Sequence, residues 1–185
     1  LLTFYVPNVR ADSTFGKTSI GGTNSSWSSR KIFSKYTLSE NGAVSKLTFY
    51  TKTGYAEESW SVKCAIYDDN ARAGGDAIGT SQEVEVGDTA SWVDFTFTTP
   101  VNLLSGDYWL GFKGEVSTYG YYDAGAPWRE RAETYNGFSD PFGTPDWTAT
   151  QDLSIYATYT PSVKYFFGEI NPQFTINHAS TWSFN

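Results

Sequence analysis

Apolar and polar residues alternate along several short stretches of the chain, and this period of two constrains the fold more than any other feature. In residues 91–98, Val93, Phe95 and Phe97 share one parity, whereas Asp94 and Thr96 occupy the other. The alternation recurs in residues 59–67, 106–113 and 153–160, and in shorter runs at 31–38, 44–52 and 82–86. Because successive side chains of a strand point to opposite faces of a sheet, each stretch predicts a strand with one buried face.

Turn-forming residues lie between these stretches, and no long segment has a helical period. Residues 40–42, with the sequence Glu-Asn-Gly, predict a hairpin-type turn, because Asn and Gly tolerate positive φ angles. Many short strands separated by turns predict an all-β fold, an antiparallel two-sheet β-sandwich. The residues expected in its core are Ile32, Phe49, Val62, Cys64, Ile66, Val93, Phe95, Phe97, Leu110, Phe112 and Ile155.

Composition limits the possible partners. The chain has 20 acidic and 13 basic residues and a net charge of −7, so it repels phosphate backbones and no nucleic-acid partner is expected. No apolar stretch approaches the ~18 residues that a membrane-spanning helix needs. The one cysteine, Cys64, has the parity of the core residues, so we expect a buried and inert thiol.

Length and composition predict one domain over residues 1–161, followed by a C-terminal extension at 162–185. Within the domain we expect a leading strand at 1–12 and a long aromatic loop region at 119–149, which is rich in Gly and Pro. The apolar runs 2–6, 164–167 and 174–176 could form edge strands or connect to a neighbouring domain or subunit. Because the chain starts without Met or a secretory signal, we expect a mature protein or a fragment.

Six motifs occur in a fixed order: AIYDDN (65–70), SWVDFTF (91–97), GDYWLGF (106–112), GYYDAG (120–125), ETYNGFSDPFG (133–143) and LSIYATYTP (153–161). With these motifs the chain resembles an extracellular module of secreted bacterial and archaeal multidomain proteins, surface proteins and phage or virus appendages. The resemblance implies a jelly-roll sandwich of the carbohydrate-binding-module kind, with an extracellular or cell-surface location. It implies no particular ligand, because such modules have no single established function.

The aromatic region predicts a carbohydrate site. Sugars present apolar C–H faces that stack on exposed rings, while their hydroxyls need polar partners, so a few polar groups beside a ring surface suit them. The alternative for each ring is that it packs the loop onto the sandwich. The expected ligand-binding residues are the rings Tyr121, Tyr122, Trp128 and Trp147, with Asp123 and Arg129 as hydroxyl partners.

Four oxygen-bearing side chains lie close together in the sequence, within residues 68–76. Ca²⁺ prefers oxygen ligands, and these side chains could hold a structural ion. Asp and Asn are also common turn formers that bond their own backbone, so an ordinary turn without a metal ion is the alternative to a calcium site. No other cofactor is expected. The candidate metal ligands are Asp68, Asp69, Asn70 and Asp76.

Catalysis is not expected. Glu83 and Glu85 share one face of a predicted strand, as the paired carboxylates of a glycosidase would, but no aromatic cleft accompanies them. The only histidine, His178, lies far from the motifs in sequence. We therefore expect a non-catalytic binding module that recognises a polysaccharide or surface glycan, or mediates surface attachment. The alternative is a structural subunit of an extracellular fibre, cell-surface layer or virion, in which terminal strands assemble neighbouring copies.

Overall fold

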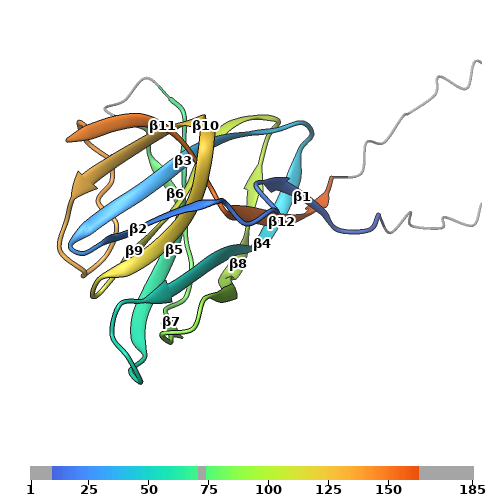
Figure 1. Cartoon of the computed structure of the whole chain (residues 1–185). Coiled ribbons are helices and arrows are strands. Elements are labelled where there is room, and N and C mark those ends of the chain that lie inside the picture. Colours follow the sequence, from blue (N-terminus) through green and yellow to red (C-terminus); the bar gives the residue numbers. More distant parts are fainter. Residues whose placement is uncertain (1–9, 71–73, 163–185) are drawn as a thin grey trace, which may run out of the picture.

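The computed structural model describes residues 10–70 and 74–162, which form twelve strands and no helix (Figure 1). In this part of the chain, no helix is long and apolar enough to cross a lipid bilayer. The apolar runs 2–6, 164–167 and 174–176 lie outside the described residues, as does His178. The strands are β1 (Ser13–Gly16), β2 (Thr23–Trp27), β3 (Arg30–Leu38), β4 (Gly42–Thr53), β5 (Trp60–Asp68), β6 (Ala77–Thr80), β7 (Val84–Val86), β8 (Ser91–Leu103), β9 (Gly106–Gly114), β10 (Thr118–Ala132), β11 (Trp147–Leu153) and β12 (Ile155–Pro161).

Strand β10 joins the two halves of one open antiparallel sheet. Its N-terminal part pairs with β4 and β2, and its C-terminal part pairs with β3 and β11. The first half also contains β8, β12 and β1, and the second half contains β9, β5, β6 and β7. The strand order is β1-β12-β4-β10-β3-β9-β5-β6, and every pairing among the described residues is antiparallel.

The two halves share one apolar core. Phe49 of β4 stacks on Phe112 of β9 with 4.3 Å between ring centroids, although these two strands do not pair. Every predicted core residue is buried except Val93, which is half-buried against the same cluster. Cys64 is buried as predicted, and burial raises the pKa of its thiol. The prediction of an antiparallel, all-β, sandwich-like fold is confirmed.

The turn at residues 40–42 differs from its prediction. It links β3 to β4, but β3 pairs with β9 and β10, whereas β4 pairs with β8, β12 and β10. The turn therefore connects the two halves of the sheet and does not close a hairpin. Asn41 stabilises this connection, because its side-chain oxygen accepts the backbone N–H of Ser105 at 2.8 Å, between β8 and β9.

The region expected as a long loop, residues 119–149, contains most of β10 and the start of β11. Two of the Gly and Pro residues that suggested a loop, Gly125 and Pro127, coincide with an irregularity in the β10–β11 ladder, whose register shifts between Asp123 and Pro127. Bulges of this kind accommodate Gly and Pro inside paired strands. Only residues 133–146 connect the two strands without regular structure.

Residues 133–146 cover the outer face of the second half of the sheet. A second apolar cluster forms there from Phe33, Tyr67, Trp109 and Phe142, with the small side chain of Ala65. The rings of Phe33 and Phe142 meet edge to face at 5.6 Å between centroids. This outer face is therefore closed by the chain itself.

Candidate functional site

The structure separates the six residues that were expected to form one binding patch. Trp128 lies in the main core, 3% exposed, with its ring centroid 6.2 Å from that of Trp27. It cannot act as an exposed stacking ring, and this part of the prediction is corrected. The physical reason is that Trp128 lies opposite Ser34 of β3 in a strand, where its parity directs it to the core.

Arg129 is buried on the opposite face of β10 and is 4% exposed. Its guanidinium carbon lies 4.0 Å from the ring centres of both Trp109 and Phe142. Its Nε and Nη2 atoms have no hydrogen-bond partner among the described residues. Burial lowers its pKa to about 9. Arg129 therefore holds two rings together by cation–π contact and is not a surface partner for sugar hydroxyls.

Three further candidates do not form one patch, because Tyr122 and Asp123 point to opposite faces of β10 and Trp147 lies at the start of β11. Tyr122 packs against the main core, and its hydroxyl lies 3.1 Å from that of Ser25. Asp123 accepts the backbone N–H of Gly22 at 2.8 Å and pairs with Lys17 at 2.8 Å, and these two contacts lower its pKa. Trp147 is 63% exposed at the start of β11. Asp123 is two positions from the sixth candidate, Tyr121, in β10 and shares its face of the sheet, whereas Tyr122 points to the core.

Tyr121 belongs to a group of rings on the solvent side of the first half of the sheet. Its centroid lies 4.9 Å from that of Tyr50, which lies 5.3 Å from Trp92, which in turn lies 5.4 Å from Tyr156. All four rings are half-buried. We call Tyr50, Trp92, Tyr121 and Tyr156 the outer aromatic cluster.

Strand parity explains why these rings gather. Tyr50 and Trp92 are directly opposite in the β4–β8 ladder, as are their core-facing neighbours Phe49 and Val93. Tyr156 follows the buried Ile155 in β12, so it faces outward too. Sequence reasoning missed these three rings, although a signal was present. Each is an aromatic residue at the position of a predicted strand that should face water.

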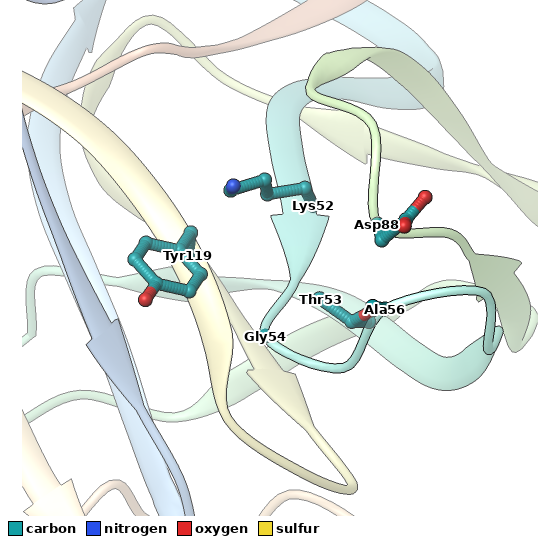
Figure 2. Close-up of a pocket in the computed structure, with 6 residues that line it drawn as sticks. All are labelled: Lys52, Thr53, Gly54, Ala56, Asp88 and Tyr119. Carbon is teal, nitrogen blue, oxygen red and sulfur yellow. The ribbon is translucent and has the colours of Figure 1, made fainter.

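A pocket of about 180 Å³ lies at the end of β4, and Figure 2 shows the residues that line it. Lys52 and Tyr119 line it and are opposite each other in the β4–β10 ladder, with the Lys52 ammonium 5.0 Å from the Tyr119 ring centre. Both residues are two positions from a cluster ring, so they share its face of the sheet. The remaining lining residues are Thr53, Gly54, Ala56 and Asp88.

The pocket contains one side chain of each charge. Asp88 accepts the backbone N–H of Glu57 at 3.0 Å, and this hydrogen bond lowers its pKa, so the carboxylate is ionised at neutral pH. Lys52 takes part in none of the ion pairs formed among the described residues. Thr53 is 1% exposed, and its hydroxyl has no hydrogen-bond partner within the same part of the chain.

Three of the four candidate metal ligands meet at the end of β5. The Asn70 amide donates to Asp68 and to Asp76, at 2.9 Å each, and the Asp76 backbone N–H donates to Asp68 at 2.7 Å. Asp69 points elsewhere and accepts hydrogen bonds from Trp109 at 2.7 Å and Lys35 at 3.1 Å. Residues 10–70 and 74–162 contain no group of three or more His, Cys, Asp or Glu side chains suited to a metal ion. Hydrogen bonding within the turn accounts for these contacts, and a calcium ion there stays a prediction.

The two strand carboxylates considered for catalysis have separate partners. Glu83 pairs with Lys63 at 2.7 Å, and this contact lowers its pKa. Glu85 accepts a hydrogen bond from Ser61 at 2.6 Å. A general acid for glycoside hydrolysis needs a raised pKa, so the environment of Glu83 does not favour that role.

The chain matches no model of a known protein family, and no curated protein matches it.

Proposed function

We propose that the chain is a non-catalytic extracellular module that binds carbohydrate through the outer aromatic cluster. The observation that carries the proposal is the contact of four half-buried rings on a solvent face, next to a pocket with charged and polar walls. Rings supply apolar area for the C–H faces of a sugar, and nearby polar groups supply partners for its hydroxyls.

Placement on strands supports the same proposal. The rings come from β4, β8, β10 and β12, which pair with one another through β4. Sites built on strands hold side chains more rigidly than sites on loops, which lowers the entropy cost of binding. Cross-strand ring pairs also stabilise a sheet by roughly 0.2–1 kcal/mol each, so the binding role needs a test independent of stability.

The fold type and location belong to this proposal. Consecutive strands β3 and β4 lie in different halves of the sheet, and so do β8 and β9, which supports a jelly-roll arrangement. The motif resemblance to secreted modules supports an extracellular or cell-surface location and a role in surface attachment.

A glycan array followed by calorimetry on the bound glycan tests the proposal. We expect Trp92→Ala to weaken binding at least about tenfold, which corresponds to 1.4 kcal/mol. Trp147→Ala is the matched control, because Trp147 is exposed but lies apart from the cluster. Absence of binding to any glycan would refute the proposal, and a loss confined to Trp147→Ala would relocate the site to β11.

A further inference from the structure

We propose that the ion pair of Lys46 and Asp94, at the edge of the outer aromatic cluster, selects glycans whose internal residues carry two adjacent free hydroxyls. The inference rests on the proposed function and adds the chemical class of the ligand. Burial of apolar area is not directional, so the rings alone accept sugar faces of many kinds. The ion pair adds selection, because it suits one arrangement of hydroxyls.

Strand register places the ion pair beside the rings. Asp94 lies two positions after Trp92 in β8, so both side chains share the outer face. Thr48 is directly opposite Asp94 in the β4–β8 ladder and directly opposite Tyr156 in the β4–β12 ladder. Trp92 also contacts Tyr156, with 5.4 Å between ring centroids. A sugar stacked on these two rings therefore has its hydroxyl-bearing edge beside Asp94.

The Asp94 carboxylate is held in one orientation and is still open to a ligand. Lys46 donates to its Oδ2 atom at 2.6 Å, and the Thr48 hydroxyl donates to its Oδ1 atom at 2.7 Å. A carboxylate has about four acceptor positions, and these two hydrogen bonds occupy one on each oxygen. The Asp94 and Lys46 side chains are 51% and 33% exposed, so a sugar can reach both. Burial acts to raise the pKa of Asp94, but the hydrogen bonds from Lys46 and Thr48 outweigh it and lower the pKa, so the carboxylate is ionised at neutral pH.

The contact between the two charges favours adjacent hydroxyls. One proton of the Lys46 ammonium points at Asp94 Oδ2, and the other two point away from it, because the group is tetrahedral. A single hydroxyl that accepts one of these two protons is therefore too far from Oδ2 to donate to it with good geometry. Hydroxyls on neighbouring carbons can satisfy both groups at once. One accepts from Lys46 while the other donates to Asp94, and both hydrogen bonds are charge-assisted.

The linkage of a glycan decides whether it offers such a pair along its length. In cellohexaose the linkage uses the fourth carbon, so internal residues keep adjacent hydroxyls on the second and third carbons. Mannohexaose and xylohexaose are linked in the same way. In laminarihexaose the linkage uses the third carbon, and the free hydroxyls of internal residues, on the second, fourth and sixth carbons, are not adjacent. Cellohexaose and laminarihexaose are thus both glucose hexamers but differ in this feature.

Calorimetry with these four hexasaccharides tests the inference. We expect the tightest of the three hexamers with adjacent hydroxyls to bind at least about tenfold more strongly than laminarihexaose. The hexamers also differ in shape, so the ratio must be measured in variants of the ion pair. Asp94→Asn and Lys46→Met should each reduce it to less than about threefold, because each removes one of the two charged partners.

Asp69→Asn is the matched control. It removes the same charge from another partly exposed pair, in which Lys35 lies 3.1 Å from Asp69 in the second half of the sheet. This variant should keep the wild-type ratio. Thermal unfolding of all three variants checks that each is folded at the temperature of the calorimetry.

The outcomes separate this inference from the proposed function. If Trp92→Ala abolishes binding but Asp94→Asn and Lys46→Met keep the wild-type ratio, the inference is wrong and the proposed function stands. Equal or tighter binding of laminarihexaose by the wild-type protein also overturns the inference. So does binding of another glycan through Trp92 when all three hexamers with adjacent hydroxyls fail to bind. If no glycan binds the wild-type protein, the proposed function and the inference both fail.

Discussion

Two lysine side chains, Lys31 and Lys113, are 0% exposed beneath residues 133–146. Both ammonium groups pair with the carboxylate of Glu133, at 2.8 Å and 2.7 Å. Lys31 also donates to the Ser139 hydroxyl, and Lys113 to the backbone oxygens of Thr134 and Gly137. Burial lowers the pKa of Lys31 despite its anionic partner. Glu133 thus provides the negative charge that compensates the two buried ammonium groups.

Replacing Glu133 by Gln should be strongly destabilising. Removal of one partner from a buried ion pair leaves uncompensated charge and costs roughly 3–5 kcal/mol. Urea unfolding of Glu133→Gln measures this cost. The control is Glu40→Gln, which breaks the partly exposed pair with Arg10 and should cost less than about 1 kcal/mol. Equal effects of the two variants would contradict the role of Glu133.

The pH dependence of stability should show the same carboxylate. Burial acts to raise the pKa of Glu133, but hydrogen bonds from Lys113, Lys31 and Ser139 outweigh it and lower the pKa to about 2. A depressed pKa contributes stability above the unfolded-state value, about 4.3, and that contribution is lost as pH falls towards 2. The difference in unfolding free energy between wild type and Glu133→Gln should therefore shrink from pH 5 to pH 2. A constant difference over this range would show that Glu133 is not the titrating group.

At the scale of elements, residues 133–146 act as a cover over β3, β9 and β5. Phe142 anchors this cover, because its ring is fully buried between Phe33, Tyr67 and the Arg129 guanidinium. The backbone N–H of Phe142 also bonds to the Gly75 oxygen at 2.9 Å, which ties the cover to the segment before β6.

Phe142→Ala should cost roughly 3–5 kcal/mol, the usual range for truncating a buried Phe. Phe138→Ala is the natural comparison, because Phe138 packs on the same cluster but is only half-buried, and its loss should be smaller. Denaturant unfolding followed by tryptophan fluorescence gives both values. A larger loss for Phe138→Ala would mean that the cover is anchored elsewhere.

The sequence predicts the faces of elements better than their pairing. Alternation places Phe95 and Ile155 in the core, because a strand with one apolar side must bury it. It does not specify that β3 and β4 lie in different halves of the sheet, since pairing is decided by contacts between distant segments. Treating residues 119–149 as a loop grouped Tyr121 with Tyr122. In a strand, such neighbours point to opposite faces, and only Tyr121 reaches the outer aromatic cluster.

The whole molecule has two outer faces of different character. The face of the second half is covered by residues 133–146, and the rings beneath, Phe33, Tyr67 and Phe142, are fully buried. The face of the first half presents Tyr50 and Trp92, with the other two cluster rings, and these remain half-buried. The first half therefore offers the apolar surface that an external ligand can contact, and the asymmetry of the fold directs the binding proposal to this side.

The most direct test of the carbohydrate proposal is an amide and side-chain NMR titration of the ¹⁵N-labelled protein with the glycan that binds best on an array. We predict that the largest shifts fall on the outer positions of β4, β8, β10 and β12, including the indole N–H of Trp92. The indole N–H signals of Trp128 and Trp147 should remain unchanged. Shifts that cluster around Trp147 instead, with Trp92 unaffected, would contradict the account.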